Sequence, residues 1–269
     1  LSSFLHGVTV SSALIGCIVG GAISGFVSSA YGRKYALIIA GVLFFLSALG
    51  SGNPEFLFFN KGEPSMGLLW MFNFYRVIGG VGVGLASAVC PMYIGEIAPA
   101  EIRGRLVSLN QFAIIFGMLI VYFVNWGIAD GQTIEWINEI GWRRMFLSEA
   151  LPAAVFILLM FLVPESPRYL ALKQKDTEAL SILTRVNGVE KAKQILEDIK
   201  STIETSKAKL YSYGKAVLII GILLSVFQQF VGINVALYYA PRIFESMGAA
   251  KDASMLQTII MGLVNVVFT

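Results

Sequence analysis

Residues 66–93 read MGLLWMFNFYRVIGGVGVGLASAVCPMY, and Arg76 is the one charged residue among these 28. A helix of about 20 mainly apolar residues can cross the hydrocarbon core of a membrane, so this stretch is long enough to span it. Six further apolar runs accompany it along the chain: 1–32, 35–54, 106–129, 146–163, 216–241 and 253–269. The pattern predicts an all-α polytopic membrane protein with seven spans.

The composition argues against a water-soluble globule. Of the 269 residues, 56% are hydrophobic and 14% are charged, and the mean hydropathy is +0.73, whereas about a quarter of the residues in a soluble domain are charged. Seventeen charged residues fall between 164 and 215, which predicts a water-exposed insert. The net charge of +3 gives no sign of a nucleic-acid surface. Cys17 and Cys90 lie far apart in apolar runs and are expected to be small buried hydrophobes rather than a disulfide or a metal site.

Basic residues between the spans orient the chain, because Lys and Arg collect in cytoplasmic loops. The loops after the first, third and fifth spans carry 14 basic residues, and those after the second, fourth and sixth carry 5. The insert is therefore predicted to be cytoplasmic. Apolar residues at helical spacing predict amphipathic helices over 176–186 and 189–203, with a turn at Asn187-Gly188 between them. So short a segment cannot bury a catalytic core of its own.

Two ionisable residues stand inside apolar spans, where burying a charge is expensive and invites a functional hypothesis. Arg76 and Glu149 are expected at similar depth in the third and fifth spans. A structural ion pair and a role in proton coupling both explain them.

Amide side chains form a second polar set. Asn110-Gln111 falls in the fourth span, and Gln228-Gln229 and Asn234 fall in the sixth. Amides offer donors and acceptors without net charge, which suits an uncharged polyhydroxyl ligand. Hydrogen bonding between helices explains them equally well.

Small residues recur every four positions, a spacing that lets helix backbones approach closely. The spacing fits either the sliding helices of a transporter or static packing. The residues concerned are Ser12, Gly16, Gly20, Gly21, Gly25, Gly80 and Gly84.

Enzyme motifs are absent from the sequence. The single histidine, His6, leaves no Ser/His/Asp triad, and no residues have metal-ligand spacing. The sequence therefore predicts neither an enzyme nor a metal or other cofactor.

Seven short motifs follow one another along the chain: YGRK (31–34), RVIGGVGVGL (76–85), PMYIGE (91–96), APAEIRG (98–104), GWR (141–143), PESPR (164–168) and FQQFVGIN (227–234). Their order and spacing closely resemble those of the sugar porter family of the major facilitator superfamily. The resemblance covers the whole chain, and it is strongest to proton-coupled bacterial members that carry xylose.

The resemblance implies a fold of twelve helices in two halves of six. The chain would then contain about helices two to eight, with helix one and helices nine to twelve outside it. Residues 1–163 would form most of the N-terminal membrane half, 164–212 the intracellular helical domain, and 213–269 the start of the C-terminal half.

The resemblance also implies roles for individual residues. In proton-coupled bacterial members, the arginine matching Arg76 partners an aspartate of helix one, with the acid matching Glu149 nearby. A second sugar-binding glutamine of those members is replaced here by Met118. A cytoplasmic salt-bridge network that steadies the outward-facing state would comprise Arg33, Glu96, Arg103, Glu165 and Arg168. The sugar site would comprise Gln111, Met118, Gln228, Gln229, Asn234, Tyr238 and Tyr239.

The expected function is uptake of a xylose-like pentose or a hexose by proton symport through alternating access. The alternative is a facilitative uniporter of the same fold without proton coupling. The expected partners are a monosaccharide, protons and the lipid bilayer, with no nucleic acid. A monomer in the bacterial inner membrane is expected.

Overall fold

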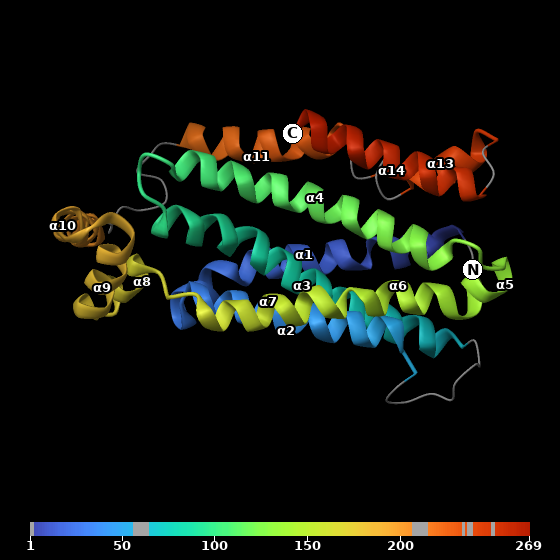
Figure 1. The fold of residues 1–269 in the computed structure, drawn as a ribbon, viewed down its shortest axis with the longest axis horizontal. Coiled ribbons are helices and arrows are strands. Elements are labelled where there is room, and N and C mark those ends of the chain that lie inside the picture. Colours follow the sequence, from blue (N-terminus) through green and yellow to red (C-terminus); the bar gives the residue numbers. More distant parts are fainter. Residues whose placement is uncertain (1–2, 56–64, 206–214, 233–234, 236–238, 249–250) are drawn as a thin grey trace. The chain divides into compact units, whose positions relative to one another are not determined.

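The computed structural model describes residues 3–55, 65–205, 215–232, 235, 239–248 and 251–269, and all regular structure in these residues is helical. The all-α prediction is therefore confirmed. The helices of Figure 1 are α1 (Ser3–Tyr31), α2 (Arg33–Gly52), α3 (Met66–Ile97), α4 (Arg103–Ala129), α5 (Ile134–Trp136), the π-helix η1 (Ile137–Gly141), α6 (Trp142–Ser148), α7 (Ala150–Leu162), α8 (Pro167–Leu172), α9 (Asp176–Asn187), α10 (Val189–Thr205), α11 (Lys215–Phe230), α13 (Ala240–Ser246) and α14 (Lys251–Phe268).

Five helical segments are long and apolar enough to cross a membrane, and they match the first five predicted spans. The sixth and seventh predicted spans contain shorter apolar segments, Ile219–Gln228 and Leu256–Phe268. The sixth predicted span, 216–241, is not one continuous helix, since α11 ends at Phe230, and residues 233–234 and 236–238 of that span lie outside the described residues. Gly232 follows with φ of 77°, a left-handed conformation that stops a helix. The five long segments are Leu5–Tyr31, Arg33–Gly52, Met66–Ile97, Arg103–Ala129 and Ile134–Leu162.

The fifth span begins at Ile134, earlier than the predicted 146. The prediction was wrong because it excluded Arg143 and Arg144, whose charges find partners in the folded chain. Arg143 pairs with Glu55, and the Arg144 guanidinium lies 5.1 Å from the centre of the Trp136 ring. A helix can therefore continue through charged residues that have such partners, although a search for uncharged runs would end it there.

This span is also irregular, because it contains a π-turn at η1 and a break between α6 and α7 at Glu149. Pro152 explains the break. Proline has no backbone N–H and its ring crowds the carbonyl four residues earlier, which here is that of Ser148. The break gives Glu149 a position at a helix junction rather than in a regular turn.

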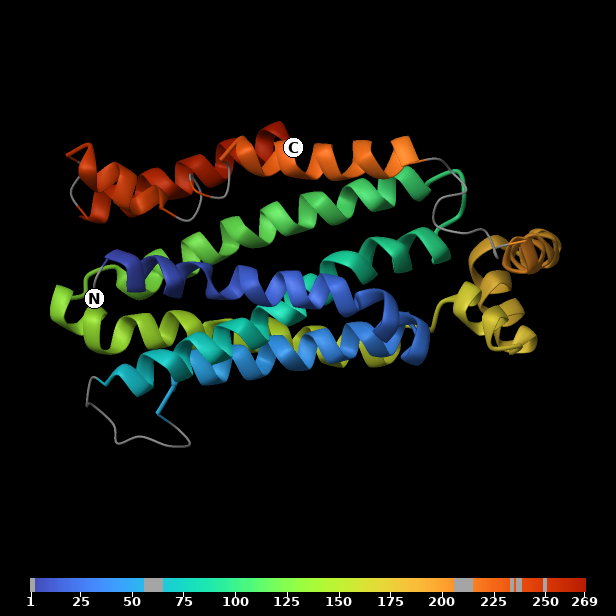
Figure 2. The same ribbon diagram turned by 180° about the vertical axis from the view of Figure 1, so that it is seen from behind.

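The described helices fall into two compact units, Leu1–Asn110 with Gly131–Leu196, and Gln111–Asp130 with Glu197–Thr269. In the first unit, α3 packs against α1 and α2, and α2 also packs against α6 and α7 (Figures 1 and 2). In the second unit, α13 packs against α14, and Gly262 of α14 lies against Leu119 and Tyr122 of α4.

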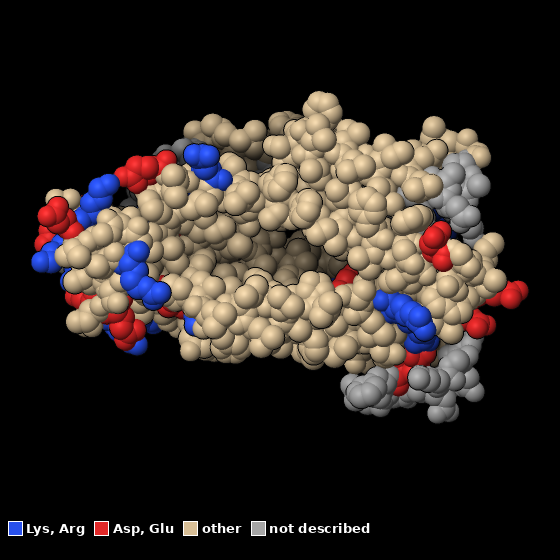
Figure 3. All heavy atoms as spheres, viewed as in Figure 1, with Lys and Arg blue, Asp and Glu red and all other residues tan. Residues whose placement is uncertain are grey.

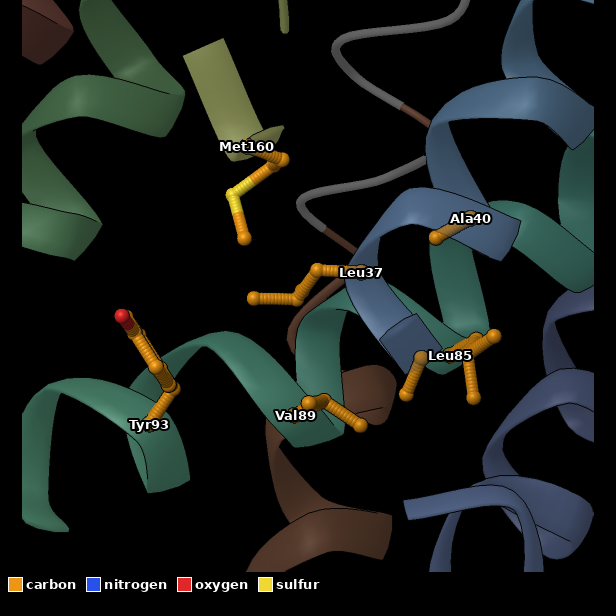
Figure 4. Close-up of a cluster of buried hydrophobic side chains, with 7 residues drawn as sticks. Leu37, Ala40, Leu85, Val89, Tyr93 and Met160 are labelled. Atoms are coloured by element: carbon orange, nitrogen blue, oxygen red, sulfur yellow. The ribbon is translucent and has the colours of Figure 1, made fainter. Parts of the chain in front are cut away.

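The core of the first unit lies where α2, α3 and α7 meet. Figure 4 shows Leu37 and Ala40 of α2 facing Leu85, Val89 and Tyr93 of α3, with Met160 supplied by α7. All of these side chains are buried. The core therefore holds α2 and α3, which carry Arg33, Arg76 and Glu96, against α7.

Glycine allows α1 and α3 to approach closely. A Cβ atom at Gly16 or Gly20 of α1, or at Gly80 or Gly84 of α3, would overlap a backbone carbonyl oxygen of the facing helix. By contrast, a Cβ atom at Gly21 would meet nothing within 4 Å, and the same holds at Gly25. The close helix contact therefore requires glycine at four of the predicted small positions but not at Gly21 or Gly25.

The charged insert forms α8, α9 and α10, and Figure 3 shows its Lys, Arg, Asp and Glu side chains gathered over these helices. The two amphipathic helices predicted over 176–186 and 189–203 correspond to α9 and α10. The predicted turn is confirmed at Gly188, which has φ of 82° between them. A left-handed residue of this kind is the common end of a helix.

Candidate functional site

A cavity of about 400 Å³ lies in the first unit, lined by residues of α1, α2, α3, α6 and α7. Its two charged lining residues are Arg76 of α3 and Glu149, at the junction of α6 and α7. Ser47 and Ser51 of α2 add hydroxyl groups, and the rest of the lining is apolar. The two ionisable residues of the apolar spans thus share one cavity wall.

Arg76 lies against two aromatic rings. Its guanidinium carbon is 6.0 Å from the ring centre of Phe72 and 5.7 Å from that of Phe146. Phe72 precedes Arg76 by four residues in α3, so both side chains lie on the same helix face. Phe146 reaches Arg76 from α6. The rings supply a partly negative π-surface to a cation in an apolar span.

A buried ion pair joins the end of α2 to the start of α6. Arg143 Nη1 donates to Glu55 Oε2 at 2.7 Å, and Arg143 Nη2 donates to Glu55 Oε1. Arg143 also lies 4.5 Å from the centre of the Trp142 ring. Glu55 is only 5% exposed. The sequence analysis did not identify Glu55, although a carboxyl directly after an apolar run is a signal that could have found it.

A second ion pair connects the other end of α2 to α3. Arg33, the first residue of α2, donates from Nε to Glu96 Oε2 and from Nη2 to Glu96 Oε1, both at 2.8 Å. The buried Ser166 hydroxyl also donates to Glu96. Such bidentate, charge-assisted pairs are among the stronger hydrogen bonds in proteins. Arg33 and Glu96, which the sequence analysis grouped in one network, are in direct contact.

Glu165 caps the N-terminus of α2. Its Oε1 accepts from the backbone N–H groups of Arg33 at 2.9 Å and Lys34 at 3.1 Å. Because the first N–H groups of a helix have no partner within it, a carboxylate there satisfies them and complements the helix dipole. Gly32 makes this possible, since it has φ of 94° and a Cβ atom would overlap the Glu165 carboxylate.

Two further members of the predicted network lie apart from these three. Arg103 Nη2 donates to the carbonyl oxygen of Ala98 at 3.4 Å. Arg168 makes no ion pair with any residue that the structure describes. The network instead includes a residue that the sequence analysis did not identify, Tyr93, whose hydroxyl donates to the Pro164 carbonyl oxygen at 2.6 Å.

The predicted sugar-site residues fall in the second unit. Gln111 begins the part of α4 that belongs to this unit, Met118 follows in the same helix, and Gln228 is in α11. Gln111 and Gln228 are exposed, and neither hydrogen-bonds to another described residue. Tyr239 is half-buried. Asn234, Tyr238 and the side chain of Gln229 lie outside the described residues.

A family model decides the identification. The model for the family described as "Sugar (and other) transporter" matches residues 1–269. The chain belongs to this sugar transporter family. The resemblance inferred from the seven sequence motifs is therefore confirmed, and the chain is part of a multi-pass membrane protein rather than an enzyme.

Individual members of the sugar transporter family are similar over almost the whole chain. The D-xylose-proton symporter of Escherichia coli K12 is 50% identical over 98% of this chain and 56% of its own length. The arabinose-proton symporter of Bacillus subtilis is 40% identical, and the glucose facilitated diffusion protein of Zymomonas mobilis is 36% identical, each over 56% of its length. The chain thus spans about half the length of these relatives.

Solved structures of the family have the same fold. The xylose transporter XylE from E. coli, in a partially occluded inward-open conformation, matches with a TM-score of 0.88 and 48% identity over 98% of this chain and 60% of XylE. XylE bound to 6-bromo-6-deoxy-D-glucose matches with a TM-score of 0.90 and 49% identity over 98% of this chain and 57% of XylE. The predicted major facilitator fold is therefore confirmed for this part of the protein.

Proposed function

We propose that the complete protein containing this chain takes up a monosaccharide by proton symport through alternating access. The observation that carries the proposal is the cavity in which Arg76 and Glu149 share one wall within apolar spans. Ionisable groups at such positions are costly and often mark proton pathways. Two relatives of this chain, at 50% and 40% identity, are named proton symporters of D-xylose and arabinose.

For the sugar site, we propose the amides of Gln111, Gln228, Gln229 and Asn234, with Tyr238, Tyr239 and Met118 beside them. The exposed amides of Gln111 and Gln228 support this proposal, because they have no hydrogen bond to a described residue and can therefore bind sugar hydroxyls. Met118 offers no strong hydrogen-bonding group at a position where the family resemblance implies a glutamine, which would change the choice of sugar.

Replacing Gln228 with alanine in the complete protein tests this site. We expect Gln228→Ala to weaken sugar binding at least about tenfold, because one or more hydrogen bonds to the sugar are lost. Binding measured by calorimetry on purified protein would report it, with thermal stability as the check on folding. Gln174→Ala, in the insert, serves as the control and should bind normally. Undiminished affinity in Gln228→Ala would exclude Gln228 from the site.

For the other parts, we propose that 164–212 lies on the cytoplasmic side of a bacterial inner membrane between the membrane halves 1–163 and 213–269. The network of Arg33, Glu96 and Glu165 then lies at the cytoplasmic ends of the helices. There it would bias the balance between outward-facing and inward-facing states according to their relative free energies.

The second candidate function is facilitated diffusion of a sugar without proton coupling. It is favoured by one observation, the 36% identity to the glucose facilitated diffusion protein of Zymomonas mobilis. Both candidates use the same fold and the same sugar site, so they differ only in whether a proton accompanies the sugar.

Proteoliposomes containing the complete protein distinguish the two functions. D-xylose and then D-glucose are added outside, and the external pH is recorded together with entry of labelled sugar. Symport predicts that sugar entry makes the external solution alkaline. Sugar entry with no pH change would instead establish the facilitative carrier, and absence of entry with both sugars would exclude them as substrates.

A further inference from the structure

Three aromatic side chains form a cluster beside the cavity, and we refer to Phe72, Trp142 and Phe146 as the aromatic cluster. The ring centres of Phe72 and Phe146 are 5.3 Å apart with an interplanar angle of 81°. Trp142 meets both rings edge-on, at 6.0 Å from Phe72 and 6.4 Å from Phe146. Edge-to-face contacts of this kind fix the directions in which the ring faces point.

Arg76 lies within cation–π distance of two of these rings. Its guanidinium carbon is 6.0 Å from the centre of the Phe72 ring and 5.7 Å from that of Phe146. The attraction between a cation and a ring is stronger where water is excluded, as in the wall of an apolar span. Only Phe146 of the two also lines the cavity, so its ring lies next to both the arginine and the space that Glu149 faces.

The aromatic cluster is itself braced from the end of α2. Arg143 stacks on Trp142 at 4.5 Å and pairs with the buried carboxylate of Glu55. A further constraint is Gly52, where a Cβ atom would lie 3.1 Å from the Arg143 carbonyl oxygen. The start of α6 is thus fixed against α2, which sets the place of Phe146 one turn later.

We propose that Phe72 and Phe146 are positioning residues for proton coupling, because their rings hold the Arg76 guanidinium at the cavity wall that it shares with Glu149. This inference rests on the proposed symport. The rings carry no proton that they can gain or lose, so their hold on the arginine persists when a carboxyl group at the cavity is protonated. The residues that line the cavity come from five helices, and among them Arg76 and Glu149 are the two that carry a charge.

Leucine substitutions of the two phenylalanines test the proposal in the complete protein. In proteoliposomes, we expect Phe146→Leu and Phe72→Leu to lower sugar-driven proton uptake about tenfold, since the cation–π contact with Arg76 is lost. Counterflow exchange of labelled sugar, which needs no net proton movement, should stay within about twofold of the unsubstituted protein. Phe156→Leu is the matched control, because Phe156 is a half-buried ring lining the same cavity and packed against the core. It should retain both activities.

A second pair of variants separates the π-surface from packing. Phe146→Tyr keeps an aromatic face and should restore proton uptake. Replacement of Phe146 by a trifluorinated phenylalanine keeps the ring shape but removes most of the negative potential of its face, so it should behave like Phe146→Leu.

The outcomes are distinguishable. Normal proton uptake in Phe146→Leu, or in the fluorinated variant, would overturn the positioning role while leaving symport in place. Equal loss of proton uptake and exchange in Phe146→Leu would also overturn it, because packing alone would then explain the effect. Absence of sugar-driven proton uptake in the unsubstituted protein, with sugar still entering, would overturn both the symport and this inference.

Discussion

Two arginines of the first unit have opposite kinds of surroundings. Arg33 is 8% exposed and makes two hydrogen bonds of 2.8 Å to one carboxylate, Glu96, which also accepts from a buried serine. Arg76 lies against two aromatic rings on the wall of a cavity that also contains Glu149. Directional hydrogen bonds fix both partners of the first pair, whereas the rings hold a cation and leave space beside it.

The contrast separates two uses of a charge in an apolar protein. A bidentate pair with further hydrogen bonds stabilises one arrangement, and breaking it leaves a buried charge without compensation. A cation held by π-surfaces beside a cavity stays in place when a neighbouring carboxyl group is protonated, and its attraction to that group then depends on the group's charge. We therefore propose that the Arg33 region stabilises individual states of the protein and that the Arg76 region serves proton coupling.

The largest effect on stability is expected from Arg33→Leu in the complete protein. Removing one partner leaves the Glu96 carboxylate without its ion pair, which costs about 3 kcal/mol in the free energy of unfolding. Thermal unfolding in detergent would measure the loss. Arg168→Leu is the control, since Arg168 makes no ion pair with a described residue, and it should change stability by about 0.5 kcal/mol or less. Equal melting temperatures of the two variants would remove the distinction between these arginines.

A smaller loss of stability is expected from Gly80→Ala. Gly80 lines the same cavity as Arg76, and a Cβ atom there would overlap the Ala13 carbonyl oxygen. Forcing α1 and α3 apart should cost about 2 kcal/mol. Gly21→Ala adds the same methyl group to α1 at a position with nothing within 4 Å. That control should be neutral or stabilising by up to about 1 kcal/mol, since alanine favours helix more than glycine. Similar unfolding temperatures for both would contradict the close helix approach.

The smallest effect on stability is expected for an ion pair at the surface. Lys191 Nζ lies 3.1 Å from Glu101 Oε1, and both side chains are about two-thirds exposed. Water screens such pairs, so Lys191→Ala should leave the melting temperature close to that of the unsubstituted protein. A loss as large as that of Arg33→Leu would show that exposure does not distinguish these pairs.

The sequence predicted much of the fold because its signals are local. Long apolar runs marked the first five spans, and Asn187-Gly188 marked the turn between α9 and α10. The start of the fifth span could not be predicted in this way, because Arg143 is tolerated there through a partner, Glu55, that is 88 residues away. Likewise, the sequence places Phe72 and Phe146 in the third and fifth predicted spans, but only the packing of α3 against α6 brings both rings to Arg76.

The site was predictable to a similar degree. Sequence motifs grouped Arg33, Glu96 and Glu165, which are close in the structure, but they also included Arg168, whose side chain makes no ion pair with any described residue. A sequence motif shows which residues occur together along the chain, but it does not show which side chains are in contact in the fold. The pairing of charges therefore needs the three-dimensional arrangement.

The proposed role of Arg76 in coupling sugar movement to protons can be tested by one comparison. Sugar accumulation driven by an inward proton gradient and sugar counterflow without a gradient are measured for the unsubstituted protein and for Arg76→Leu in proteoliposomes. We expect Arg76→Leu to lose accumulation above equilibrium and to keep counterflow. Accumulation by Arg76→Leu equal to that of the unsubstituted protein would contradict it.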